Sequence, residues 1–173
     1  MAEAQLLLLR HGIAEPRGGS GEDGLRALTQ EGRDRTRRIC QRLSQLGLRA
    51  STLVSSPLVR ARQTADIAVE AGMAPALLCN EALAPGADPW PLLENWWRAE
   101  SDDAPARLIL VGHEPDLSQL ACGLIAAPPG ALVLKKAGLA VLGWDQGPSA
   151  ASAFPADQAR LLLLLTPRTL LPT

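Results

Sequence analysis

Short runs of aliphatic residues recur along the chain, separated by longer segments in which apolar positions follow a helical spacing. Two of these runs, Gln5–Leu9 and Arg107–Val111, are apolar at nearly every position, which is typical of strands buried on both faces of a sheet. We predict strands in these two runs and also in Ser51–Ser55, Ala76–Cys79 (a short edge strand), Leu139–Trp144 and Arg160–Thr166.

The amphipathic segments between these runs predict helices. Thr29 is suited to cap a helix that ends at Gly47, and its inward positions are spaced four and three residues apart. These positions are Gly32, Thr36, Ile39, Leu43 and Leu46. A second helix is expected to start at Ser56-Pro57, with the hydroxyl as cap and proline at the first helical position, and to stop at Gly72. Further helices are expected near Pro91–Ala99 and from Pro115 to about Ile125.

Strands that alternate with helices indicate βαβ units and an α/β fold. We expect a single domain of three layers, α/β/α, with a mainly parallel central sheet and helices on both faces. A chain of 173 residues is long enough to bury a core and too short for two full domains. The domain is expected to span residues 1–166, with Pro167–Thr173 as a C-terminal tail.

The charge balance and the cysteines narrow the classes of function. The chain has 17 basic and 18 acidic side chains, which leaves no basic excess for binding nucleic acid. Its aliphatic runs are far shorter than the ~20 residues that span a bilayer, and its start lacks the pattern of a signal peptide. The widely spaced Cys40, Cys79 and Cys122 indicate reduced, packed thiols of a cytoplasmic protein. We therefore expect no nucleic acid, no membrane and no metal.

The only two histidines of the chain directly follow predicted strands. One strand leads into Arg10 and His11, and another leads into His113. A third strand precedes a helix that carries Arg60 in its first turn. Because open α/β sheets bind ligands at the carboxyl ends of their strands, we expect these four side chains to converge there.

These residue types suit the chemistry of a phosphoryl group. Guanidinium groups and the free N–H groups of a helix start bind phosphate oxygens. An imidazole is largely unprotonated near neutral pH and is a competent nucleophile. Its attack on phosphorus would form a phosphohistidine that water then hydrolyses, while the arginines and the second histidine stabilise the charge on the oxygens. This scheme requires no metal and no other cofactor.

Three motifs that occur in this order, each after a strand, resemble those of the histidine phosphatase superfamily, the phosphoglycerate-mutase-like proteins. They are Arg10-His11-Gly12, the segment SPLVRARQTA at 56–65, and Gly112-His113-Glu114. Finer features resemble its small bacterial branch, the SixA phosphohistidine phosphatases: LTQEG at 28–32, VGHEPDLS at 111–118 and LTPR at 165–168. The resemblance covers essentially the whole chain.

The resemblance implies that His11 is the nucleophile that becomes phosphorylated, and that Arg10, Arg60 and His113 complete the phosphate pocket. It also implies a substrate: phosphohistidine on a protein, such as a signalling phosphotransfer domain. Larger members carry a long insertion with a glutamate that protonates the leaving group. Here the corresponding span is short, and Glu81 lies roughly where that acid belongs. A short span leaves the pocket open to a protein side chain, and imidazole departs readily once protonated, even from water.

Two other functions stay open. The chain is alternatively a phosphomonoesterase or mutase of the same superfamily, whose substrate is a small phosphorylated molecule. A function of another class is a catalytically silent, phosphate-binding docking module. The sequence leaves the physiological substrate and the oligomeric state undetermined.

Three remaining features have interpretations that do not involve catalysis. The basic residues between Arg33 and Arg42 indicate a solvated helix face, which would alternatively dock an acidic partner. Gly19–Gly24 matches GxGxxG, but it lies well after the first strand, so we expect a loop beside the pocket rather than a dinucleotide site. Trp90, Trp96 and Trp97 are expected to pack a short helix.

Overall fold

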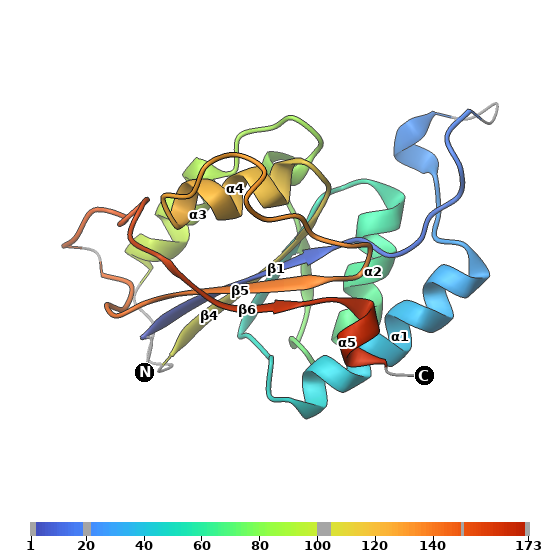
Figure 1. The fold of residues 1–173 in the computed structure, drawn as a ribbon, viewed down its shortest axis with the longest axis horizontal. Coiled ribbons are helices and arrows are strands. Elements are labelled where there is room, and N and C mark those ends of the chain that lie inside the picture. The colour runs from blue at the N-terminus through green and yellow to red at the C-terminus, as the bar shows by residue number, and fades with distance from the viewer. Residues whose placement is uncertain (1–2, 19–21, 100–104, 150, 172–173) are drawn as a thin grey trace.

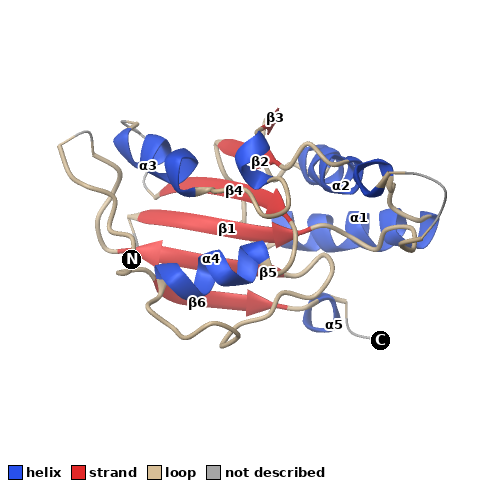
Figure 2. Cartoon of the chain, turned by 90° about the horizontal axis from the view of Figure 1, so that it is seen from above, coloured by secondary structure: helices blue, strands red, loops and turns tan. Residues whose placement is uncertain are grey.

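The computed structural model describes residues 3–18, 22–99, 105–149 and 151–171, and these contain one mixed sheet. Its strands lie in the order β3-β2-β4-β1-β5-β6. They are β1 (Ala4–Arg10), β2 (Thr52–Ser55), β3 (Leu77–Cys79), β4 (Ala106–Gly112), β5 (Leu139–Trp144) and β6 (Arg160–Leu165). All six predicted strands are confirmed. Strands β1 to β4 are parallel, and β5 pairs antiparallel with both β1 and β6 (Figure 2), so the mainly parallel sheet is also confirmed.

Helices cover both faces of the sheet (Figures 1 and 2). One face carries α1 (Gln30–Gln45), α2 (Val59–Glu70) and α5 (Pro167–Leu170), and the other carries α3 (Trp90–Arg98) and α4 (Asp116–Leu124). Alternate side chains of β1 belong to the two cores: Leu7 and Leu9 pack with α1 and α2, whereas Leu6 and Leu8 pack with α3 and α4. This confirms the three-layer α/β/α architecture. Two short 3-10 turns, η1 (Asp23–Leu25) and η2 (Glu81–Leu83), complete the elements.

The antiparallel direction of β5 brings a further loop to the carboxyl ends of β1 and β4. After α4 the chain returns to the end of β1, where the backbone N–H of Ala137 donates to the carbonyl oxygens of Arg10 and His11, each at 3.1 Å. Strand β5 therefore starts beside the two residues that the sequence placed in a site. Residues 135–138 become neighbours of Arg10 and His11 for this reason.

Several boundaries differ from the prediction. The cap of α1 is confirmed, since Thr29 Oγ1 accepts from the Gly32 N–H at 2.9 Å, but Leu46 lies beyond the helix and is half exposed. Helix α2 begins at Val59 rather than at Pro57. The expected tail contains helix α5, whose Leu170 packs into the core. This helix is stabilised by a capping box between Thr166 and Thr169. The prediction of a tail did not include a helix here.

The thiols and the helices bear on two further expectations. Cys40 and Cys122 are buried free thiols, whereas Cys79 is exposed, so the prediction of a packed thiol is wrong for Cys79. Among the residues that the structure describes, no helix combines the length and the apolar character that a membrane span requires.

Candidate active site

The turn after β1 is held tightly between two helices. A Cβ atom on Gly12 would lie 2.2 Å from Thr36 Oγ1 of α1, so only glycine fits at this position. Gly32 of α1 is equally constrained, because a Cβ there would lie 2.0 Å from the carbonyl oxygen of Ile13. On the other side, the Gly12 N–H donates to Thr64 Oγ1 of α2 at 3.1 Å. The backbone that carries His11 is therefore fixed by close packing and by a hydrogen bond.

His11 is held in one tautomer by its neighbour. Its Nδ1 lies 2.7 Å from the carbonyl oxygen of Gly12, which can only accept, so Nδ1 carries the proton and Nε2 is left with its lone pair. Burial lowers the pKa of His11 to about 3, and the nearby charges of His113, Arg60 and Arg10 act in the same direction. The imidazole is therefore neutral at physiological pH. A neutral ring with a free Nε2 is the form that acts as a nucleophile.

His113 follows β4 and faces His11. The two ring centroids are 5.3 Å apart, and His113 Nε2 lies 2.7 Å from Ser56 Oγ. The same hydroxyl accepts from the N–H of Leu58 at 3.3 Å. Ser56 thus joins the start of the α2 segment to His113 instead of capping a helix that begins at Pro57. Burial, followed by the charge of Arg60, lowers the pKa of His113 to about 4, so this ring is also neutral.

Arg60 lies in the first turn of α2, as predicted, and its side chain is 2 % exposed. Its Nη1 donates to the carbonyl oxygen of Asp23 at 2.8 Å, and its Nη2 donates to the carboxylate of Asp23 at 3.0 Å. Arg26 Nε also contacts this carboxylate, at 2.8 Å. The hydrogen bond from Arg26, together with the charge of Arg60, lowers the pKa of Asp23. The ionised carboxylate of Asp23 therefore pairs with Arg60 within the cavity.

Arg10 completes the cluster from the last position of β1. Its Nη1 donates to the carbonyl oxygen of Leu134 at 2.7 Å, which orients the guanidinium. Three buried nitrogens in this cluster find no hydrogen-bond partner among the described residues: Arg10 Nε, Arg60 Nε and His113 Nδ1. Buried polar groups without partners are rare in folded proteins and costly. Their concentration here indicates a place for a ligand rich in acceptor oxygens.

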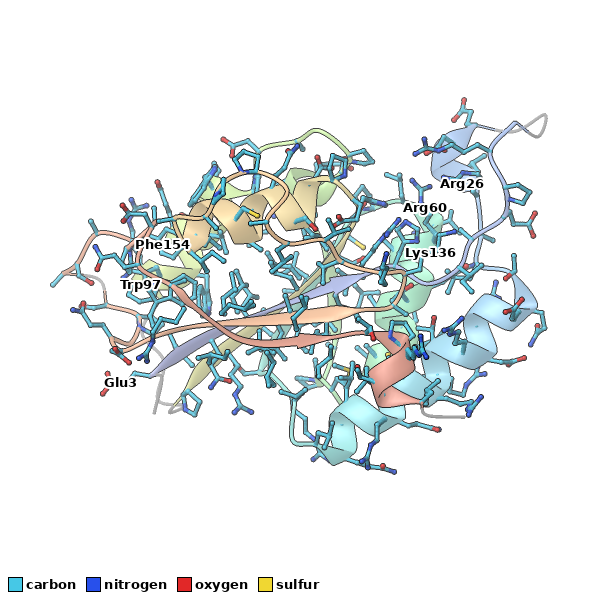
Figure 3. The ribbon with its side chains drawn as sticks, in the orientation of Figure 1. Glu3, Arg26, Arg60, Trp97, Lys136 and Phe154 are labelled. Atoms are coloured by element: carbon cyan, nitrogen blue, oxygen red, sulfur yellow. The ribbon has the colours of Figure 1, made fainter. Side chains whose placement is uncertain are left out.

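These side chains line one cavity of about 400 Å³. The structure therefore brings together all four residues that the sequence predicted. Five of the lining residues are arginine or lysine and three are carboxylates, so the cavity favours an anion. The lining residues are Arg10, His11, Ala14, Glu15, Pro16, Arg17, Asp23, Arg26, Arg60, Pro85, His113, Glu114 and Lys136. Figure 3 shows Arg26, Arg60 and Lys136, three of these cations, at the same end of the molecule.

Glu81 does not belong to this group. It is exposed in η2 and does not line the cavity, and the exposed Arg62 does not line it either. Within the described ranges, no three His, Cys, Asp or Glu side chains are grouped in a way that could hold a metal ion.

Comparison with known proteins places the chain in a family. A model of the histidine phosphatase superfamily (branch 1) matches residues 6–81. An uncharacterized protein of Picosynechococcus is 41 % identical over 170 residues, which cover 97 % of this chain and 99 % of that protein. The chain belongs to the histidine phosphatase superfamily. It is accordingly a hydrolase of the phosphatase type, as the resemblance of its sequence motifs implied.

Solved structures of phosphatases share the fold across nearly the whole chain. The protein histidine phosphatase SixA complexed with tungstate has a TM-score of 0.78 at 19 % identity, covering 96 % of this chain and 99 % of that one. A SixA-type protein from Agrobacterium tumefaciens is 24 % identical with a TM-score of 0.69, covering 94 % and 97 %. A mycobacterial glucosyl-3-phosphoglycerate phosphatase has a TM-score of 0.73 at 20 % identity, covering 94 % and 98 %. The phosphoglycerate-mutase-like fold of a histidine phosphatase is thus confirmed.

Sequence reasoning did not predict the other charged residues that line this cavity, and three of them show why. Glu114 follows His113 directly, so its position alone was a sufficient signal. Asp23 belongs to the GxGxxG-like stretch, of which residues 19–21 lie outside the described part, and the sequence predicted only a loop beside the pocket there. Lys136 gave no signal in the sequence, because it reaches the cavity only through the antiparallel return to β5.

Proposed function

We propose that the protein hydrolyses phosphohistidine on a protein substrate through a covalent intermediate on His11. The observation that carries this proposal is the 2.7 Å hydrogen bond from His11 Nδ1 to the Gly12 carbonyl, which leaves Nε2 unprotonated in a cationic cavity. A docking module that only binds phosphate does not require an unprotonated, nucleophilic Nε2 on His11. We therefore favour an enzyme over a module that only binds phosphate.

The reaction has two steps. In the first, Nε2 of His11 attacks phosphorus, a new P–N bond forms, and the P–N bond to the substrate imidazole breaks while that imidazole takes a proton from water. In the second, water attacks phospho-His11, inorganic phosphate leaves, and the electron pair returns to Nε2. Throughout, Nδ1–H stays bonded to Gly12, and the guanidinium groups of Arg10 and Arg60 stabilise the charge on the phosphoryl oxygens.

Two of the three carboxylates of the cavity, Asp23 and Glu114, are bound by donors of the protein itself, which favours a P–N bond over a phosphate ester as substrate. Asp23 is paired with Arg26 and Arg60, which lower its pKa and keep it ionised. Glu114 accepts from the hydroxyl of Ser118 at 2.6 Å and from its N–H at 3.2 Å. Asp23, which two arginines keep ionised, is a poor proton donor to an alkoxide, whereas imidazole leaves without a strong general acid.

A small phosphate ester is the second candidate substrate. The solved mycobacterial relative acts on glucosyl-3-phosphoglycerate, and a cavity of about 400 Å³ has room for a compact phosphorylated molecule. The two candidates differ in leaving group: an alkoxide requires a proton donor in the cavity, and an imidazole does not.

Trapping the intermediate tests the reaction class. Wild-type protein mixed with ³²P-labelled phosphohistidine peptide and quenched in alkali is expected to carry acid-labile, alkali-stable label. His11→Ala is expected to carry none and to lose activity by roughly 10⁴-fold or more, as nucleophile removal does in other enzymes. Equal activity of His11→Ala and the wild type would contradict the proposal and favour the docking module.

Comparing substrates tests the leaving group. We expect kcat/KM for a phosphohistidine peptide to exceed that for 3-phosphoglycerate and for p-nitrophenyl phosphate. Equal or faster hydrolysis of 3-phosphoglycerate would show instead that the substrate is a small ester, while leaving the role of His11 intact.

A further inference from the structure

A second cavity lies next to the catalytic one. It has a volume of about 590 Å³ and shares Arg10 and Lys136 with the catalytic cavity, so the two are adjoining. Its remaining lining residues are Ile13, Arg35, Lys135, Thr166, Pro167 and Arg168. Four separate parts of the chain supply these walls: the segment after β1, α1, the loop before β5 and the start of α5. We call this cavity the basic groove.

Every ionisable residue that lines the basic groove is a cation. Five arginines and lysines line it and no carboxylate does, on a chain whose formal net charge is only −1. The cations of its outer part, Arg35, Lys135 and Arg168, are exposed, and none of them forms an ion pair within the described residues. By contrast, Arg37 on the same helix is paired with Asp34. The positive charge of the groove is therefore not neutralised by the protein itself.

The basic surface continues beyond the groove along α1. Arg38 and Arg42 follow Arg35 at spacings of three and four residues, so these exposed side chains share one face of the helix. This face extends ~10 Å further, at 1.5 Å per residue. A small phosphorylated molecule would fill only the catalytic cavity and would not contact a charged surface of this length. A macromolecule whose surface carries carboxylates is complementary to it.

We propose that the basic groove docks acidic side chains of the phosphoprotein beside its phosphohistidine. The groove also has an apolar part, Ile13 and Pro167, which suits the hydrocarbon portions of a protein segment. With its acidic residues in the groove, the substrate would present its phosphorylated imidazole to His11 across the shared residues Arg10 and Lys136. This inference rests on the proposed function, because it names the kind of protein that the phosphohistidine belongs to.

Two synthetic peptides of equal length test the proposal. Each carries one histidine phosphorylated with phosphoramidate; one is rich in glutamate around it, and the other has glutamine at each of those positions. We expect the wild type to show a KM about tenfold lower for the glutamate peptide, an advantage that salt diminishes. The triple variant Arg35→Glu, Lys135→Glu, Arg168→Glu should lose this preference while its kcat on free phosphohistidine stays within about twofold of the wild type.

A matched control reverses a charge elsewhere. Arg98→Glu changes an exposed arginine of α3, on the opposite face of the sheet, and should keep the preference for the glutamate peptide. Equal KM values for both peptides with the wild type, or a preference that survives the triple variant, would overturn the groove as a docking site. An equal loss on free phosphohistidine would also overturn it, because the cations would then act on the catalytic cavity. Failure of the proposed function has a different signature, namely no hydrolysis of either peptide by the wild type.

Discussion

The two ends of the sheet differ in whether their buried polar groups have hydrogen-bond partners. At the amino end of β1, Trp97, Trp144 and Phe154 pack edge to face or tilted, with ring centroids 5.5 to 5.8 Å apart. Both indole N–H groups there have acceptors: Trp97 donates to Ser152 Oγ at 3.2 Å, and Trp144 donates to the carbonyl oxygen of Pro155 at 2.9 Å. At the carboxyl end, nitrogens of Arg10, Arg60 and His113 are buried without a partner.

This difference separates the part of the molecule that stabilises the fold from the part that is built for a ligand. Aromatic contacts with satisfied N–H groups lower the free energy of the folded state. Buried cations and unpartnered donors raise it, and a protein retains them where a bound group supplies the missing contacts. Substitutions at the two ends should therefore have opposite effects on stability and on activity.

The largest effect on stability is expected at the aromatic end. Trp97 is fully buried, so Trp97→Ala should lower the free energy of unfolding by about 3–5 kcal/mol, through lost burial and the cavity that remains. Urea unfolding measures this loss. The rate of phosphohistidine hydrolysis per folded molecule should stay unchanged, because the residue belongs to the other end of the sheet. Trp96→Ala, at a partly buried neighbour, should destabilise less.

Arg60 provides the converse test at the catalytic end. Arg60→Ala removes a buried guanidinium from the cavity and should lower kcat/KM by about 10²–10³-fold, as loss of one transition-state donor does. Unfolding in urea should remain cooperative, with a midpoint near that of the wild type. Arg62→Ala is the matched control, since it removes an exposed arginine from the same helix and should change neither quantity. Loss of cooperative unfolding in Arg60→Ala would make Arg60 a structural residue instead.

The same contrast explains what the sequence was able to predict. Aliphatic runs identified every strand. In β1 and β4 they reflect burial on both faces of the sheet, whereas the leucines of β6 are largely exposed. The short spacing between a strand end and a histidine placed His11 and His113 on one edge, since parallel strands share that edge. Two features depend on the path of the chain between elements, which the hydrophobic pattern does not encode. The antiparallel β5 brings Lys136 to the cavity, and the loop before α1 brings Asp23 to Arg60.

Lowering the pH should destabilise the folded protein through the two histidines of the catalytic end. The pKa values of His11 and His113 are about 3 and about 4 in the folded protein, against 6.5 for an ordinary histidine. Between pH 6.5 and about 4, the unfolded chain therefore binds protons that the folded protein does not, and the free energy of unfolding falls as the pH falls. The slope is about 1.4 kcal/mol per pH unit for each histidine, and there is none above pH 7 from this source.

Chemical unfolding at a series of pH values measures that slope. His113→Gln should reduce it by about half, because one of the two titrating rings is gone. Trp97→Ala should shift the whole curve down by a constant amount and leave the slope as it is in the wild type. An unchanged slope in His113→Gln would mean that this ring is charged in the folded protein.

The smallest effect is expected at Asp23. Its carboxylate accepts a hydrogen bond from Arg60 Nη2, a donor that an anionic ligand would otherwise use. Asp23→Asn keeps the backbone carbonyl that Arg60 Nη1 contacts but removes the negative charge that repels a phosphoryl group. The inhibition constant of inorganic phosphate, measured by competition with a phosphohistidine peptide, should fall about two- to fivefold. Asp34→Asn, which neutralises another exposed aspartate paired with an arginine, should leave it unchanged. Weaker phosphate inhibition in Asp23→Asn would show the opposite role, in which the carboxylate holds Arg60 in position for the ligand rather than competing with it.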